Sequence, residues 1–200
     1  MNKRVFIVHG WGGYPQYGWF GWLIKELEAR GFVVWIPQLP DTNNPKIEPW
    51  VEALANVVGL PDENTYFIGY SMGCQTIVRY LERLSDVGIV GGAVFVAGFF
   101  KRLTGLENEP NGNEIAKHWL DTPLDLARAR AHLSHSVAIF SDNDPYVPLD
   151  NQDDFSIHLG SKIIIEHNKG HFSEGLDGTR ELPIVLNTLM QLCNESLDKK

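Results

Sequence analysis

Residues 65–73 read Thr-Tyr-Phe-Ile-Gly-Tyr-Ser-Met-Gly, and this stretch decides the fold. Its first half is a short run of aromatic and β-branched residues, which predicts a strand over residues 66–69. A helix is expected over residues 72–84, because several apolar residues after Ser71 share one helical face. These residues are Ile77, Val78, Leu81 and Leu84. A buried strand that turns into a helix within a few residues is the building block of an α/β sheet.

The turn between this strand and this helix has the pattern Gly69-x-Ser71-x-Gly73, which is typical of a nucleophile elbow. An elbow holds its serine on strained backbone, and a side chain at either glycine would collide with the neighbouring strand or helix. The turn presents the hydroxyl at the positive end of the helix. An ordinary turn serine is the alternative, but the position of the motif between strand and helix favours Ser71 as a catalytic nucleophile.

Short apolar runs alternate with longer amphipathic ones along the rest of the chain. Strands are predicted over residues 4–8, 32–36, 66–69, 93–96, 137–141 and 162–166, and helices over 19–30, 47–58, 72–84, 124–133 and 181–193. The strand runs are rich in Val, Ile and Phe without polar alternation, which is typical of parallel strands buried on both faces. The order predicts a doubly wound α/β fold of about six mostly parallel strands, with helices on both faces.

Two signals mark helix ends. Gly31 is expected to cap the helix over 19–30, because glycine adopts the left-handed conformation easily. Thr122-Pro123 is expected to begin the helix over 124–133, with the proline in its first turn.

The 200 residues are expected to form one domain over 1–194, followed by a polar tail over 195–200. The interval 99–135 is longer than a simple crossover and holds a turn at Pro110-Asn111-Gly112-Asn113. Because it follows the carboxyl end of a strand, it is either a small lid over the active face or an ordinary crossover with an extra turn.

The first predicted strand runs directly into His9-Gly10-Trp11-Gly12-Gly13. A His-Gly pair at this point is typical of a loop whose backbone N–H groups stabilise the oxyanion of acyl transfer. We expect the N–H groups of Trp11 and Met72 to form this oxyanion hole, and His9 to be a structural hydrogen-bonding residue. A dinucleotide-binding loop is the alternative. Its third glycine, however, is replaced by Pro15, and no acidic residue ends the second strand.

A serine nucleophile needs a histidine base and an acid that orients the base. α/β hydrolases supply these residues in the chain order Ser, then Asp or Glu, then His. Asp144 is the preferred acid, because residues 144–148 resemble the Asp-x-x-Val-Pro spacing that α/β hydrolases have at their acid. Asp142 is the alternative acid and is otherwise expected to cap or buttress the loop. His171 is the preferred base, because the glycine before it lets the loop turn toward the serine, and His167 is the second choice.

Composition narrows the class of protein. The formal charge is −8 and there is no basic stripe, so no nucleic-acid partner is expected. No apolar run approaches the ~20 residues of a membrane span, and the run after the basic N-terminus is too short for a signal peptide, so we expect a cytoplasmic protein without membrane contact. Cys74 and Cys193 do not indicate a disulfide framework or a zinc site, and Cys74 is expected to be a small buried residue.

Aromatic residues crowd the segment after residue 13 and flank the predicted catalytic loops. Trp11, Tyr70, Trp119 and Phe172 are expected to line an apolar pocket for a short acyl or aromatic group. For each of them, packing in the core is the alternative. No basic cluster in these loops indicates an anionic substrate.

Together the motifs resemble the small serine hydrolases related to retinoblastoma-binding protein nine, including uncharacterised bacterial members. The resemblance rests on residues 9–12, 69–73, 141–148 and 170–172, and it spans nearly the whole chain. It implies a compact α/β-hydrolase fold with little or no cap. It also implies hydrolysis of a small ester or amide through an acyl-enzyme, without metal or cofactor. No substrate or protein partner carries over, since the chain lacks the Leu-x-Cys-x-Glu segment that docks on retinoblastoma-type pockets.

The interpretation is therefore a serine hydrolase, of either a carboxylesterase or an amidase and aminopeptidase-like type. One alternative is a protein-binding or scaffold member of the fold with weak or no turnover. An acyl transferase that uses the same three residues is another.

Overall fold

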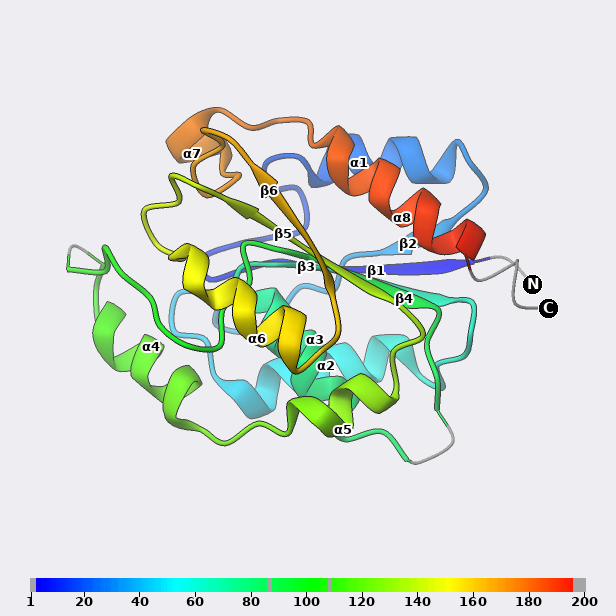
Figure 1. Cartoon of the computed structure of the whole chain (residues 1–200), viewed down its shortest axis with the longest axis horizontal. Coiled ribbons are helices and arrows are strands. Elements are labelled where there is room, and N and C mark those ends of the chain that lie inside the picture. The colour runs from blue at the N-terminus through cyan, green and yellow to red at the C-terminus, as the bar shows by residue number, and fades with distance from the viewer. Residues whose placement is uncertain (1–2, 86–87, 108, 196–200) are drawn as a thin grey trace.

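The computed structural model describes residues 3–85, 88–107 and 109–195. Its centre is a six-stranded sheet in the order β2-β1-β3-β4-β5-β6, and every neighbouring pair is parallel (Figure 1). The strands are β1 (Arg4–Val8), β2 (Val33–Trp35), β3 (Thr65–Tyr70), β4 (Gly92–Val96), β5 (Ser136–Ser141) and β6 (Lys162–Glu166). All six predicted strands are present, and the predicted doubly wound parallel architecture is confirmed.

Helices cover both faces of the sheet (Figure 1). One face carries α1 (Phe20–Glu28) and α8 (Pro183–Glu195). The other carries α2 (Ile47–Val58), α3 (Met72–Glu82), α5 (Leu126–Ala131) and α6 (Gln152–Ile157). Three further elements lie in the connections: α4 (Gly112–Asp121), the 3₁₀ turn η1 (Leu149–Asn151) and α7 (Glu174–Asp177). In the described part of the chain, no helix combines the length and apolar character needed to cross a bilayer.

Each face of the sheet has its own apolar core, and β1 shows why. Val5 and Ile7 pack with the residues of α1 and α8, whereas Phe6 and Val8 pack with those of α2 and α3. Successive side chains of a strand point to opposite faces, so a strand covered by helices on both sides must be apolar at every position. The uninterrupted apolar runs of the sequence reflect this two-sided burial.

The two edge strands depart from the expectation that all strands are buried on both faces. The side chains of β2 and β6 are exposed or half-buried along their whole length, whereas every residue of β3, β4 and β5 is buried. An edge strand has a neighbour on one side only, so the helices that cover its faces leave part of it open to water. Apolar composition alone does not distinguish an edge strand from a central one.

Of the two predicted helix ends, the one at Gly31 is confirmed and the one at Thr122 is wrong. Gly31 has a φ of 84°, and its N–H donates to the carbonyl of Glu28, so it closes α1 as predicted. The prediction for Thr122 was wrong, because this residue lies at the end of α4 and its N–H donates to the carbonyl of His118. The next helix begins only at Leu126, and Asp125 caps it by accepting from the N–H of Arg128 at 2.9 Å.

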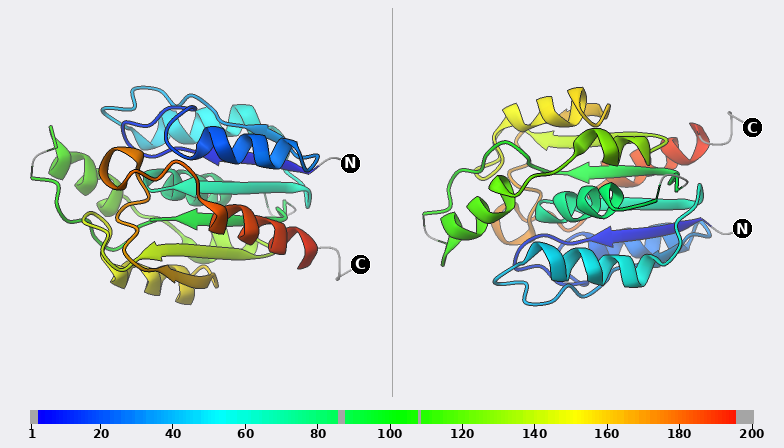
Figure 2. Two further views of the ribbon diagram at one scale, coloured as in Figure 1. Left: turned by 90° about the horizontal axis from the view of Figure 1, so that it is seen from above. Right: turned by 90° about the horizontal axis from the view of Figure 1, so that it is seen from below.

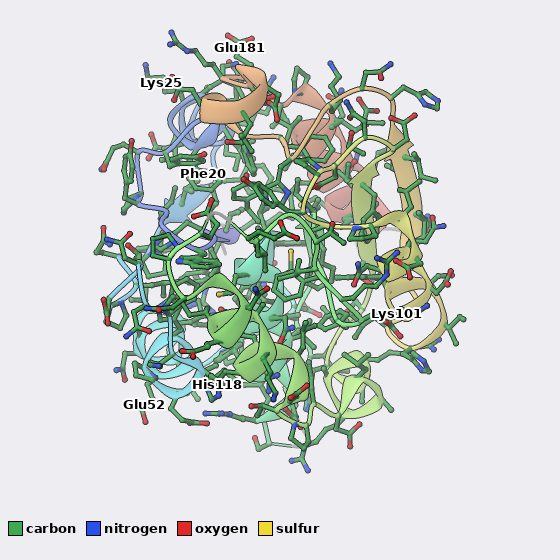
Figure 3. All side chains as sticks on the ribbon, turned by 90° about the vertical axis from the view of Figure 1, so that its left-hand side faces the viewer. Phe20, Lys25, Glu52, Lys101, His118 and Glu181 are labelled. Atoms are coloured by element: carbon green, nitrogen blue, oxygen red, sulfur yellow. The ribbon has the colours of Figure 1, made fainter. Side chains whose placement is uncertain are left out.

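The carboxyl ends of all six strands point to one edge of the sheet, and α4 and α7 lie at this edge (Figure 2). Figure 3 views the molecule from this side, with His118 of α4 and Lys101 labelled at the near surface. The chain runs from β1 outward to β2 and then returns to β3 on the other side of β1. In open α/β sheets the ligand site lies at such a switch point, so a site is expected beyond the ends of β1 and β3.

Two glycines allow the unusually close packing at the end of β3. A Cβ added to Gly73 would lie 2.1 Å from the carbonyl oxygen of Val8 and 2.7 Å from that of His9. A Cβ on Gly69 would lie 2.8 Å from Ile77 Cδ1 and 2.9 Å from Cys74 Cα. Helix α3 therefore packs directly against the end of β1 at Gly73 and against the end of β3 at Gly69, which explains both glycines of the motif.

We predict that Gly73→Ala lowers the free energy of unfolding by about 3 kcal/mol or more, because backbone would have to move away from the added methyl group. Gly21→Ala is a matched control within α1, where an added Cβ meets nothing within 4 Å. It should stabilise the fold by about 0.5 kcal/mol. Urea denaturation measures both, and a Gly73→Ala protein as stable as the wild type would contradict this account of the packing.

Candidate active site

Ser71 lies on strained backbone between β3 and α3. Its φ is 52° and its ψ is −120°, a conformation that is costly for a residue with a Cβ. Its N–H donates to the carbonyl of Val96 on β4 at 2.8 Å, and its carbonyl accepts from the N–H of Cys74 at 3.0 Å. The neighbouring strand and the first turn of the helix thus hold the serine in this conformation.

His171 and Asp144 complete a hydrogen-bonded chain with this serine. His171 Nε2 lies 3.1 Å from Ser71 Oγ, and His171 Nδ1 lies 2.7 Å from Asp144 Oδ2. The other carboxylate oxygen of Asp144 accepts from the backbone N–H groups of Tyr146 and Val147 at 2.8 and 3.0 Å. The carboxylate fixes the imidazole with its proton on Nδ1, which leaves Nε2 free to accept the serine proton. The structure therefore brings together the three residues predicted as nucleophile, base and acid.

The loop after β5 binds the loop after β6 residue by residue. Side chains of four consecutive residues, 141–144, accept hydrogen bonds from residues 167–171. Ser141 Oγ accepts from the N–H of Lys169 at 3.0 Å, Asp142 Oδ1 from that of Asn168 at 2.9 Å, and Asn143 Oδ1 from that of Gly170 at 2.8 Å. The Asp144–His171 bond is the last member of this ladder. The acid and the base are consequently held by the same set of contacts.

Asp142 and His167, the alternative acid and base, form an exposed pair of their own. His167 Nδ1 lies 2.6 Å from Asp142 Oδ2, and the side chain of His167 is 80% exposed. The N–H of Asn168, followed by the bond to His167, lowers the pKa of Asp142, and the same bond raises the pKa of His167. Neither residue contacts Ser71 in the described part of the chain, so the pair braces the loop.

Conformation and packing aim His171 at the serine. Its neighbours Gly170 and Phe172 have φ values of 52° and 55°, and a Cβ on Gly170 would lie 2.7 Å from Asp177 Oδ2. The buried Tyr70 hydroxyl donates to the carbonyl of His171 at 3.0 Å. A small residue before the histidine is therefore required both by the turn and by the space available.

The loop predicted to form the oxyanion hole, residues 9–13, reaches Ser71 from the end of β1. A Cβ on Gly10 would lie 3.0 Å from Ser71 Cβ, so the loop passes directly beside this serine. The loop is tied down by bonds from Gly12 N–H to the carbonyl of Thr42 and from Gly13 N–H to that of Gly10. Among the described residues, no acceptor engages the N–H of Trp11 or that of Met72, the first residue of α3.

A cavity of about 470 Å³ opens over these groups. Both Ser71 and His171 line it, together with the predicted residues Trp11, Tyr70 and Met72. Its remaining wall includes Tyr17, Asn43, Leu103, Leu106, Tyr146 and Leu176. Among the described residues that line the cavity, and apart from the tyrosines, two have an acidic or basic side chain: Glu109 and His171.

The expectation that Trp119 and Phe172 line this cavity is wrong. The indole of Trp119 is fully buried, stacks edge-on against Trp50, and donates to the carbonyl of Pro45 at 3.1 Å. Phe172 is also fully buried, in the core beneath α1 and α8, and its carbonyl accepts from the indole of Trp19. Trp119, from the possible lid interval 99–135, and Phe172, next to His171, are therefore both core residues.

Several cavity residues carried no usable signal in the sequence. Asn43, Leu103 and Leu106 come from connections whose course depends on tertiary contacts, and Leu176 belongs to the four-residue α7. Short helices such as α7 and α6 have too few periodic residues to be recognised. In the described residues, no group of three or more His, Cys, Asp or Glu side chains is arranged to hold a metal ion.

Comparison with known proteins decides the family. Residues 5–191 match the family described as serine hydrolase. The chain belongs to the serine hydrolase family. It is 31% identical over 189 residues to the YdeN protein of Bacillus subtilis (strain 168), covering 94% of this chain and 95% of that protein. It is 27% identical over 173 residues to the serine hydrolase RBBP9 of Rattus norvegicus, covering 86% and 87% of the two chains.

Solved structures agree on the fold of this serine hydrolase. The crystal structure of the ydeN gene product from B. subtilis superposes with a TM-score of 0.87 at 29% identity, covering 96% of this chain and 100% of that one. Est1E from Butyrivibrio proteoclasticus superposes with a TM-score of 0.71 at 12% identity, covering 98% and 89%, and indicates the fold alone. The six-stranded parallel sheet with flanking helices is thus an α/β-hydrolase fold, as the sequence resemblance implied.

His9 links the loop after β1 of this hydrolase to the segment after β2. Its Nε2 accepts from the N–H of Leu39 at 3.3 Å, and its Nδ1 lies 3.0 Å from the carbonyl of Gly10, to which it donates. The ring is fully buried and packs edge-on against Trp50. Burial lowers the pKa of His9, against a smaller opposite effect of the Gly10 bond. The structure thus gives His9 the structural role that was expected of it.

We predict that His9 makes the fold less stable as the pH falls below about 6.5, the usual pKa of a histidine in an unfolded chain. Between that value and its lowered pKa in the fold, the unfolded chain binds more protons, so acidification favours unfolding. Urea denaturation from pH 7.5 to pH 5 should therefore show a larger loss of stability for the wild type than for His9→Asn. Parallel pH profiles of the two proteins would show that His9 is not held neutral by the fold.

Proposed function

We propose that this serine hydrolase cleaves a small ester or amide through an acyl-enzyme intermediate. The observation that carries the proposal is the unbroken hydrogen-bond chain from Ser71 through His171 to Asp144, whose serine end lines an open cavity. In this proposal Ser71 is the nucleophile, His171 the general base and Asp144 the orienting acid. The partner is a small-molecule substrate.

In the first half-reaction, Ser71 Oγ attacks the substrate carbonyl carbon as His171 Nε2 takes its proton. Asp144 stabilises the imidazolium that forms, and its two backbone N–H partners hold its carboxylate in place. Collapse of the tetrahedral intermediate breaks the bond to the alcohol or amine, which leaves with the proton from His171. The acyl group remains on Ser71.

The tetrahedral intermediate carries its negative charge on the former carbonyl oxygen. The N–H groups of Trp11 and Met72 are assigned to this oxyanion, since both residues line the cavity next to Ser71 and no protein acceptor occupies their N–H groups among the described residues. The N-terminus of α3 adds the positive end of a helix of 11 residues. Water then attacks the acyl carbon as His171 takes its proton. The bond from this carbon to Ser71 Oγ breaks, Ser71 regains the proton from His171, and the acid product is released.

The cavity favours an uncharged or weakly polar substituent of modest size. Its wall combines aromatic and aliphatic side chains, and within the described residues no Lys or Arg lines it. A volume of about 470 Å³ lies in the range of small-molecule sites. Cys74 takes no part, because it is fully buried and burial raises the pKa of its thiol.

Labelling by a fluorophosphonate probe tests the proposal, because only an activated serine reacts quickly. We predict that Ser71→Ala abolishes labelling, and that Ser71→Ala and His171→Ala each lower ester turnover by a factor of about 10⁴–10⁶. The double variant should lose little more than either single one, since the two residues act as one unit. Losses that multiply in the double variant would contradict that assignment.

A well-folded wild type that resists labelling would instead favour a protein-binding or scaffold role. Turnover that partitions to added alcohols or amines in preference to water would favour an acyl transferase. A panel of matched esters and anilides then separates the carboxylesterase from the amidase alternative.

The two loop aspartates provide a second prediction. Asp144→Asn would face its amide toward His171 Nδ1, favour the wrong tautomer, and lower kcat by a factor of about 10³ or more. Asp142→Asn should lower kcat less than about threefold, because its partner His167 is exposed and remote from Ser71. Circular dichroism and thermal unfolding establish that both variants fold. The reverse order of effects would make Asp142 the orienting acid.

A further inference from the structure

One buried amide outside the proposed triad makes an unusually complete set of hydrogen bonds. The side chain of Asn151, at the end of η1, has no exposed surface. Its Oδ1 accepts from the backbone N–H groups of Phe100, Lys101 and Arg102 at 3.1, 3.0 and 3.4 Å. Its Nδ2 donates to the carbonyls of Arg102 and Pro148, both at 3.0 Å. Every donor and acceptor of the amide is therefore used.

These bonds join two segments that lie about 50 residues apart in the chain. Residues 100–102 leave the end of β4 and begin the interval that the sequence suggested as a lid, and Lys101 marks this point in Figure 3. Asn151 follows the loop that carries Asp144. Further along, Thr104 donates from its N–H to the carbonyl of Tyr146 and from its Oγ1 to that of Pro145, both at 2.9 Å.

The clamped segment is also a wall of the cavity. Phe99, Leu103 and Leu106 line the cavity beside or between the bonded residues, and Tyr146 lines it from the acid loop. The Tyr146 ring lies edge-on to His171, with centroids 5.2 Å apart. The distance between this wall and the catalytic residues is therefore set by the contacts between residues 99–106 and residues 144–151.

Among these contacts, the hydrogen bonds of Asn151 contribute most to holding the two segments together, because its side chain is buried. The ion pair of Arg102 with Asp150, at 2.9 Å, spans the same two segments, but its arginine side chain is half exposed, and exposed pairs contribute little. Removing the Asn151 amide would leave three N–H groups and two carbonyls without this partner. Asp at this position would keep the acceptor but lose both donated bonds and add a buried charge.

We propose that Asn151 is a positioning residue that fixes the wall formed by Phe99, Leu103 and Leu106, and thereby sets the size of the acyl or leaving group that the cavity accepts. The inference rests on the proposed ester or amide hydrolysis at this site. It assigns the beginning of the 99–135 interval to a fixed wall. It also separates the residue that limits substrate size from the residues that perform the chemistry.

Asn151→Ala tests the proposal, with Asn113→Ala, an exposed position on α4, as the matched control. One substrate series pairs 4-nitrophenyl octanoate with 4-nitrophenyl acetate, and the other pairs benzyl acetate with ethyl acetate. A loosened wall should raise the large-to-small ratio of kcat/KM by about fivefold in at least one series, mainly through KM. Fluorophosphonate labelling of Ser71, which needs the catalytic residues and not the wall, should change less than about twofold.

In these kinetic and labelling assays of Asn151→Ala, either of two results would overturn the proposal. Ratios that stay equal to those of the wild type in both series would show that Asn151 does not set substrate size. An equal loss of labelling and of kcat/KM for every ester would show that it acts on the catalytic residues and not on the wall.

A second variant and a second measurement test the proposal if Asn151→Ala does not fold or if the protein shows no turnover. If Asn151→Ala shows no cooperative unfolding transition, Thr104→Val replaces it, since this exposed residue loses only its Oγ1 bonds. The large-to-small ratio should then shift in the same direction by a smaller factor, and an unchanged ratio would overturn the proposal.

Hydrogen exchange of the Phe100, Lys101 and Arg102 amides reports on the clamp, the hydrogen bonds from these amides to Asn151, without any turnover. An inactive, unlabelled wild type would therefore overturn the proposed function alone, and unchanged exchange in Asn151→Ala would overturn the clamp.

Discussion

The absence of a side chain at Gly73 is the constraint on which the site depends. It lets α3 begin against the carbonyl oxygens of Val8 and His9, closer than any Cβ would permit. Because β1 and β3 are parallel neighbours with Val8 in register with Gly69, this contact sets the loop after β1, the proposed oxyanion loop, beside Ser71. The strained Ser71 conformation follows from the same geometry, since the chain must reverse direction within one residue to start a helix there. Local sequence thus determines half of the site.

The other half of the site, which includes His171, follows strands that lie away from β3 in the sheet. Strand β6, which precedes His171, lies three positions from β3, or about 14 Å at the usual spacing of strands. The loop after β6 therefore runs back over the end of β5, and its ladder with residues 141–144 is what holds it there. Tyr70 completes the path by binding the carbonyl of His171 from the strand that carries Ser71. A polar ladder suits this task, because it fixes the direction of the loop as well as its distance.

This division explains what could be predicted from the sequence. The strands and the proposed triad residues were recognisable because each depends on a short segment: an apolar run, a glycine pattern, or a residue just after a strand. Trp119 and Phe172 were misassigned because an aromatic residue in a possible lid or next to a catalytic loop has the same local pattern whether it points into the cavity or into the core. Thr122 has the composition of a helix start, but it ends α4. There Arg79, about two turns into α3, donates to the carbonyls of Trp119 and Thr122. Asn151 carried no signal at all, since its partners lie about 50 residues away.

If both proposals hold, the chemistry and the substrate size are specified by different parts of this chain. The groups that would form and break bonds are fixed by strand ends and glycine contacts, where almost any change alters the backbone itself. The wall from Phe99 to Leu106 lies on a connection outside the sheet, and its position relative to His171 depends on side-chain bonds from Asn151 and Thr104. Such a wall can change without disturbing the sheet, because loops tolerate substitution better than the strands that support them. A scaffold arranged in this way can keep one reaction while its pocket varies, which is why the motifs of this sequence indicate the reaction and not the substrate.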